Sequence, residues 1–190
     1  RQSSDHKVNF EVEYSRLNAA GEVISSGYVF YVVTNDEGHW GMQYRAPGQL
    51  RSESDEAVLI DARLAAIALV DEFFVAFNAA DNAALLKVSH VPQVMLSAGQ
   101  FIFAETSASP IVTMNFERMR ERENWHSSEL GDFEVVNVSE NQVIVELSFE
   151  RFNPNAEHYL TGPAVWVLSK RKGSWGVEFR SLMPPIRHLE

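Results

Sequence analysis

The sequence contains no cysteine, and this absence excludes several kinds of chemistry at once. Without thiols the chain has no disulfides, no thiolate metal site and no cysteine nucleophile. The composition fits a reducing compartment, and we expect a cytoplasmic protein. The chain also lacks any run of roughly 18 apolar residues, the length that a helix needs to cross a bilayer. We therefore expect no membrane partner.

Basic residues are scarce: 16 Lys and Arg stand against 26 Asp and Glu, which gives a formal net charge of -10. Such a surface repels phosphate backbones, and the densest basic stretch, residues 170–172, falls in a predicted hairpin turn. We expect no nucleic-acid partner. The sequence also lacks a His-x-x-x-His pair, a Gly-rich phosphate loop and a Gly-x-Ser-x-Gly motif. We expect neither a metal nor a cofactor.

What the sequence does contain is an internal repeat. Residues 8–45 align with residues 143–180 without a gap, and most of the differing pairs exchange one apolar residue for another. A repeat with this long a period indicates tandem small domains rather than a solenoid. Identical pairs include Glu11/Glu146, Arg16/Arg151, Asn18/Asn153, Gly27/Gly162, Gly38/Gly173, Trp40/Trp175 and Arg45/Arg180.

Each copy of the repeat has the pattern of a three-strand meander. Apolar and polar residues alternate along residues 8–15 and 143–150, which is the period of a half-buried strand. Gly38 and Gly173 close the second turn, where glycine supplies a positive φ. In the last strand, alternation predicts Trp175, Val177 and Phe179 on one face, with Glu178 and Arg180 on the other.

The segment between the two copies is predicted to be mainly helical at first. Residues 48–56 form a polar linker, and a long helix follows at about 60–79, because its apolar residues recur at helical spacing. Asp81 caps a short second helix. Residues 91–96 and 101–103 then form a hairpin, Pro110 opens a third helix, and residues 132–138 begin the final meander.

This order of elements resembles the nuclear transport factor 2-like superfamily, also called SnoaL-like. The stretches that carry the resemblance are FFVAFNAADNAALLKVSHVPQVMLSAGQF, GSWGVEFRS and GHWGMQYRA. The resemblance implies an α+β cone, in which a curved, mostly antiparallel sheet wraps around a long N-terminal helix. It divides the chain into a partial unit (1–47), the linker (48–56), a complete unit (57–184) and a tail (185–190), and we expect the tail to end in a tag scar.

The first copy lacks the helical segment that precedes the second. The absence of an initiator Met and the start at Arg1 favour a fragment of a longer protein, and a genuine half-unit is the alternative. A fragment implies an upstream segment resembling residues 55–142.

The cone of this superfamily encloses a cavity, and an apolar cavity with a few polar groups is the usual form of a ligand site. We expect a small apolar ligand there. Each aromatic residue taken singly is more often ordinary core. The predicted lining residues are Phe73, Phe77, Gln93, Val94, Trp125, Trp166 and Phe179.

Catalysis is the competing hypothesis. Isomerases of the superfamily place an Asp base near the first hairpin, which here reads Val-Pro-Gln-Val-Met-Leu and has no acid. Dehydratases pair His with Asp, and His126 with Asp132 is the candidate pair for a lyase or isomerase. Epoxide hydrolases use an Arg between two acids. Arg151 and Arg180 recur in the first copy, however, so a structural role, paired with Glu146, is favoured for both.

The remaining expectations concern assembly. Superfamily members dimerise through the outer face of the sheet, so we expect a homodimer or a self-association of the tandem units. The polar set Glu146, Ser148, Glu178 and Arg180 would form that interface. The apolar first meander must also find cover, and we expect it to join a sheet, with Trp40 and Tyr44 largely buried.

Overall fold

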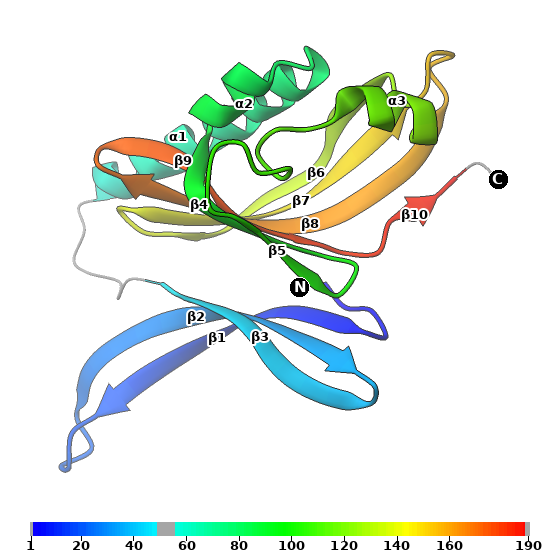
Figure 1. Cartoon of the computed structure of the whole chain (residues 1–190). Coiled ribbons are helices and arrows are strands. Elements are labelled where there is room, and N and C mark those ends of the chain that lie inside the picture. The colour runs from blue at the N-terminus through cyan, green and yellow to red at the C-terminus, as the bar shows by residue number, and fades with distance from the viewer. Residues whose placement is uncertain (1, 49–55, 189–190) are drawn as a thin grey trace.

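The computed structural model describes residues 2–48 and 56–188. Residues 49–55, which are most of the predicted linker, and the predicted tag scar at 189–190 lie outside the described residues. The described chain forms a three-stranded sheet and a seven-stranded sheet. Figure 1 shows the smaller sheet on one side of the larger sheet and the helices on the other side. No helix among the described residues is long and apolar enough to cross a membrane.

The three-stranded sheet is the predicted first meander. Its strands, in spatial order, are β1 (Lys7–Leu17), β2 (Val23–Asp36) and β3 (His39–Pro47). The side-chain oxygen of Asn18 accepts from the backbone N–H of Ala20 and Glu22, both at 2.9 Å, and so forms the first turn. Asn153 does the same in the second copy. The recurrence of this asparagine therefore has a structural cause.

The part of the chain predicted as a complete unit, here called the complete unit, follows the predicted order of elements and adds the short strand β10. Its sheet has the order β5-β4-β9-β8-β7-β6, and β10 pairs with β8. All strand pairs are antiparallel except β4 with β9. The elements are α1 (Glu56–Asn78), α2 (Asn82–Lys87), β4 (Ser89–Ser97), β5 (Gln100–Ala104), α3 (Phe116–Glu123), β6 (Ser127–Val138), β7 (Gln142–Phe152), β8 (His158–Arg171), β9 (Ser174–Leu182) and β10 (Ile186–Arg187).

The helix caps agree with one prediction and correct another. Asp81 caps α2 as predicted, because its carboxylate accepts from the backbone N–H of Ala83 and Ala84. Pro110, in contrast, does not open the third helix. The helix begins after Asn115, whose side chain accepts from the N–H of Arg118 at 2.9 Å.

A β-bulge in β9 reverses the predicted alternation. Val167 of β8 pairs with Phe179, and the next residue, Leu168, pairs with Val177, so Glu178 is the extra residue. Val177 consequently packs in the cluster under α1, whereas Phe179 belongs to the cluster on the other face of the sheet. The prediction that these two residues share a face is therefore wrong.

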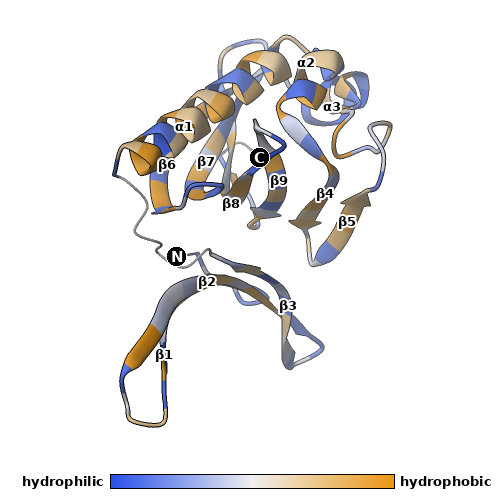
Figure 2. Ribbon diagram, turned by 90° about the vertical axis from the view of Figure 1, so that its left-hand side faces the viewer, coloured by the Kyte–Doolittle hydropathy of each residue, from blue (hydrophilic) through white to orange (hydrophobic). Residues whose placement is uncertain are grey.

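The two sheets pack face to face, and repeat-equivalent residues meet across the interface. The Tyr44 and Phe179 rings are stacked, with centroids 3.7 Å apart and planes 6° apart. Such pairing of equivalent positions is the pattern of a two-fold dimer interface, here formed within one chain. Figure 2 shows the smaller sheet curving under the strands of the larger one. The same apolar cluster contains the equivalent pairs Phe30/Val165 and Val32/Val167.

Two expectations about the first meander are corrected by this packing. It does not join the larger sheet edge to edge but covers its outer face. Trp40 is 47% exposed, because it lies on the opposite face of β3 from the interface. Its equivalent, Trp175, packs against the core under α1, and the described residues provide no such helix over Trp40. Tyr44 is partly buried, as its stacking on Phe179 requires.

A buried lysine joins the two sheets. Lys7 is 5% exposed, and its ammonium donates to the hydroxyl of Ser181 at 3.2 Å and to the carbonyl of Leu182. The Ser181 hydroxyl in turn donates to the side-chain oxygen of Asn9 at 3.0 Å. Burial lowers the pKa of Lys7 to about 8, because the ammonium loses hydration.

Tyr44→Ala tests the sheet-to-sheet packing. We expect it to lower the free energy of unfolding by about 2–4 kcal/mol, because the stacked ring leaves a cavity against Phe179. Trp40→Ala, on the exposed face of the same strand, should change it by no more than about 0.5 kcal/mol. Urea unfolding followed by circular dichroism measures both. Equal losses for the two variants would contradict the packing described here.

Lys7→Met tests the buried ammonium through pH. The pKa of Lys7 in the folded state lies below its unfolded value of about 10.4, so the unfolded state binds more protons between these two values. The stability of the unaltered protein relative to Lys7→Met should therefore rise as pH increases from about 7.5 to about 9.5, by on the order of 1–2 kcal/mol. Well below pH 8, where Lys7 is charged in both states, its destabilising effect is fully present. If the free energies of unfolding of the two proteins change in parallel with pH, the pKa of Lys7 is not shifted.

Candidate functional site

The cone of the complete unit contains a cavity of about 160 Å³ between α1 and the sheet. Aromatic and methionine side chains form most of its wall, and two arginines and one serine contribute the polar part. The described lining residues are Phe73, Phe74 and Phe77 from α1, Met95 from β4, Met114 and Met119 from the α3 region, and Ser128, Phe149, Arg151, Trp166, Arg180 and Leu182 from β6–β9.

Five of the seven predicted lining residues belong to this part of the molecule. Phe73, Phe77 and Trp166 line the cavity itself. Gln93 is fully buried and supports the wall, since its amide donates to the carbonyl of Val177 at 2.7 Å. Trp125 lies one layer further out. Its ring contacts Phe77 edge-on at 5.5 Å, and its indole N–H donates to the hydroxyl of Ser128 at 2.9 Å.

Val94 and Phe179 lie elsewhere, and their predicted place in the cavity is wrong. Both belong to the apolar cluster between the two sheets, on the face of the larger sheet away from α1. The cause for Phe179 is the bulge at Glu178. Val94 pairs with Phe179 in the β4–β9 ladder and points to the same side.

The structure does not bring the predicted catalytic pair into the cavity. His126 is exposed, and its backbone N–H donates to the carbonyl of Phe152. Its neighbour Trp125 is turned inward, and successive residues of an extended chain point in opposite directions. Asp132 is also exposed and borders a shallow pocket on the outer face of the sheet. The side chains of neither residue line the cone.

Arg180 lies on the inner side of β9, opposite Trp166, and not on the outer face that the alternation along this strand predicts. It is 4% exposed, and its Nη2 donates to the side-chain oxygen of Gln93 at 3.2 Å and to the carbonyl of Ile111 at 2.6 Å. The guanidinium carbon lies 5.5 Å from the ring centroid of Phe73. Burial lowers the pKa of Arg180 to about 10. No carboxylate within residues 2–48 and 56–188 forms an ion pair with it.

The internal repeat gave no indication that Arg180 is buried. Both copies carry a bulge at the same position, Gln43 in β3 and Glu178 in β9, so the following arginine turns toward the same face in each. In the complete unit that face lies under α1, and Arg180 is buried. In the first meander it faces solvent, and Arg45 is exposed. Two identical residues at equivalent positions of the repeat therefore have different surroundings. The sequence around Arg45 and Arg180 does not indicate which of them is buried.

Arg151, the second cation of the cavity, is neutralised by a carboxylate. It forms an ion pair with Glu123, rather than the predicted structural pair with Glu146. Its guanidinium lies over the ring of Phe149 at 5.2 Å, and Arg16 lies over Tyr14 at the same distance in the first copy. This stacking explains why the arginine recurs.

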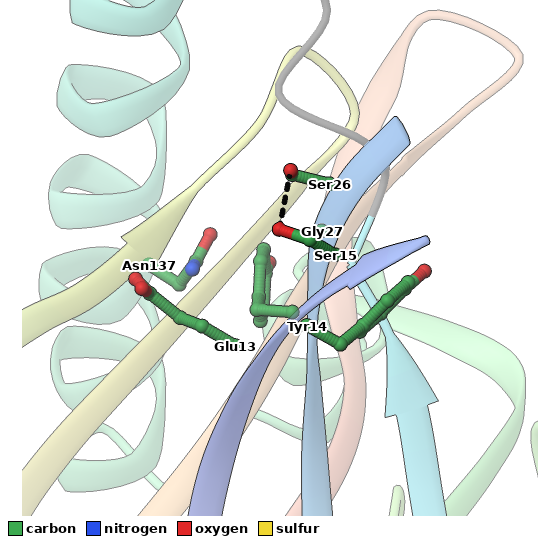
Figure 3. Close-up of a pocket in the computed structure, with 7 residues that line it drawn as sticks. Glu13, Tyr14, Ser15, Ser26, Gly27 and Asn137 are labelled. Atoms are coloured by element: carbon green, nitrogen blue, oxygen red, sulfur yellow. Dashed lines mark hydrogen bonds between the residues drawn. The ribbon is translucent and has the colours of Figure 1, made fainter. Parts of the chain in front are cut away.

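Other hollows of the described surface are weaker candidates. A groove of about 240 Å³ lies between β1, β2 and β6. The hydroxyls of Ser15 and Ser26 form a hydrogen bond of 2.9 Å there (Figure 3). Glu13 and Ser15 are exposed there, so solvent already satisfies their polar groups. In the described ranges no group of three or more His, Asp or Glu side chains is placed to hold a metal ion.

Comparison with solved structures identifies the fold. An NTF2-like protein with a cystatin-like fold from Novosphingobium aromaticivorans matches with a TM-score of 0.54 and 12% identity, over 67% of this chain and 84% of that one. A hexachlorocyclohexane dehydrochlorinase, LinA-type3, from Novosphingobium barchaimii matches with a TM-score of 0.53 and 10% identity, over 70% and 94%. A putative aromatic ring hydroxylase from Novosphingobium aromaticivorans matches with a TM-score of 0.52 and 16% identity, over 68% of this chain and 94% of that one.

At these identities the likeness shows the fold alone. The chain has the nuclear transport factor 2-like, or cystatin-like, α+β fold, preceded by an additional three-stranded sheet that is consistent with part of a second unit. No known family profile matches the sequence, and no curated protein matches it.

Gln93→Leu tests the support of the cavity wall. The change removes an acceptor from Arg180 and a donor from the Val177 carbonyl, so we expect a loss of about 1–3 kcal/mol in the free energy of unfolding. Gln100→Leu, at an exposed position of the same hairpin, should cost about 0.5 kcal/mol or less. Thermal unfolding of both variants provides the measurement. A neutral Gln93→Leu would mean that this hydrogen-bond pair is not formed.

Proposed function

We propose that the cone of the complete unit binds a small, mostly apolar molecule. The observation that carries the proposal is the cavity under α1, lined by aromatic and methionine side chains and closed on one side by a hydrogen-bonded polar group. A volume of about 160 Å³ suits a ligand with a single ring, since an apolar cavity of about 150 Å³ accommodates benzene.

The lining favours binding over a lyase or isomerase reaction. Such reactions need a base within hydrogen-bond reach of the proton that is removed. None of the described lining residues is Asp, Glu or His. The likeness to the dehydrochlorinase, at 10% identity, shows the fold and carries no argument about activity. The alternative in which His126 acts as the base thus gains no support from the geometry of the cone.

The packing of the two sheets supports an assembly role for the first meander. It covers the outer face of the complete unit through repeat-equivalent residues, as Tyr44 on Phe179 illustrates. We therefore propose self-association of the tandem copies within the chain. A homodimer through this same face would have to displace the first sheet. Arg180, moreover, is on the inner side of β9 and is not available to such an interface.

The methionines provide a test of ligand binding. The chain has five, and Met95, Met114 and Met119 line the cavity. Met42 is exposed on β3, and Met183 is buried near Asn9 of the first sheet, so both serve as internal controls. In a protein labelled with carbon-13 at the methionine methyl groups, benzyl alcohol should shift the three cavity signals and leave the other two in place. Uniform shifts, or none at millimolar concentration, would refute the proposed function.

A further inference from the structure

The polar side of the cavity contains Arg180, a cation for which the described residues provide no counter-ion. An isolated buried charge is strongly unfavourable unless it is paired and hydrogen-bonded. An arginine does not avoid this cost by losing its proton, because its pKa in water is above 12. Arg180 has two acceptors, the Gln93 side chain and the Ile111 carbonyl, and both are neutral. Its positive charge is thus solvated in part but not balanced.

Two neighbouring buried side chains at this point each carry an N–H without an acceptor among the described residues. Trp166 and Arg180 are direct register partners on β8 and β9, and both line the cavity. The guanidinium carbon of Arg180 is 5.9 Å from the centroid of the Trp166 ring. Nε of Arg180 and Nε1 of Trp166 are both enclosed and have no acceptor among the described residues. A buried N–H donor without an acceptor lowers the free energy of unfolding by about 1–3 kcal/mol.

We propose that the ligand is a small cyclic carboxylic acid, bound as its carboxylate. This inference rests on the proposed function, because it names the chemical class that the same cavity accepts. The carboxylate oxygens accept from the guanidinium of Arg180 and the indole N–H of Trp166. The ring occupies the apolar part, between Phe73, Phe77 and the methionines.

The charge of the cavity favours a carboxylate over a phosphate. Among the described residues Arg180 has no acidic partner, whereas Arg151, the other arginine of the cavity, is paired with Glu123. One cation balances a monoanion, whereas a phosphate dianion would leave a buried negative charge. A carboxylate can accept charge-assisted hydrogen bonds from the remaining N–H donors of Arg180, because Nη2 already donates to Gln93 and Ile111.

Benzoate and benzamide provide the test on the unaltered protein, because they have nearly the same shape and differ in charge. Calorimetric titration should give benzoate a dissociation constant at least about tenfold lower than that of benzamide. Both compounds should shift the methyl signals of the cavity methionines. Equal affinities would overturn the carboxylate assignment and leave the proposed function intact. If neither compound shifts those signals, the proposed function fails as well.

Arg180→Met tests whether Arg180 causes the preference for benzoate over benzamide. Binding of benzoate should fall to the level of benzamide, while benzamide retains its affinity within about threefold. Arg45→Met is the matched control, because Arg45 is the repeat-equivalent arginine and is exposed; it should leave both affinities unchanged. If Arg180→Met still prefers benzoate, or if inorganic phosphate displaces benzoate from the unaltered protein at equal concentration, the assignment is wrong. Because the ligand comparison uses the unaltered protein, misfolding of the variant does not remove the test.

Discussion

A sheet with two apolar faces has to be covered on both sides, and this requirement organises the whole chain. Strand β8 shows it most clearly, because nearly all of its central residues are buried. Trp166 and Leu168 face the core under α1, and Val165 and Val167 face the first sheet. The hydrophobic effect scales with the apolar area removed from water, so neither layer is dispensable. The first meander, which is marginal alone, gains its stability from the same contact.

The cavity follows from the curvature of the sheet and from one bulge. The strands wrap around α1 and leave space that the aromatic side chains do not fill. The extra residue Glu178 then turns Arg180 from the outer side to the inner side of β9, and bulges commonly re-aim side chains in this way. A short irregularity in the ladder therefore decides whether the cone is purely apolar or contains a charge.

Much of the fold was predictable from local patterns. The 3.6-residue spacing of α1, the cap at Asp81 and the hairpin β4–β5 each have a cause within a few residues, and the structure has all three. The internal repeat predicted two meanders of the same form. The pocket residues on α1, Phe73 and Phe77, also followed from helical periodicity, because one stripe of such a helix faces the sheet.

The parts that failed depend on partners distant in the sequence. The bulge at Glu178 is a property of the pairing of β9 with β8, so the alternation read from β9 alone placed Phe179 and Arg180 on the wrong faces. Comparing the copies added to the error, because Arg45 and Arg180 are identical while α1 covers only the second. His126 was favoured for its place beside Trp125, although neighbours on an extended chain point apart.

A crystal structure of the protein grown with benzoate tests the central claim most directly. The expected result is electron density for one ring inside the cone, with both carboxylate oxygens within hydrogen-bond distance of donors on Arg180 and Trp166. A cone filled by its own side chains, or a ring bound with its carboxylate turned away from Arg180, would contradict the account.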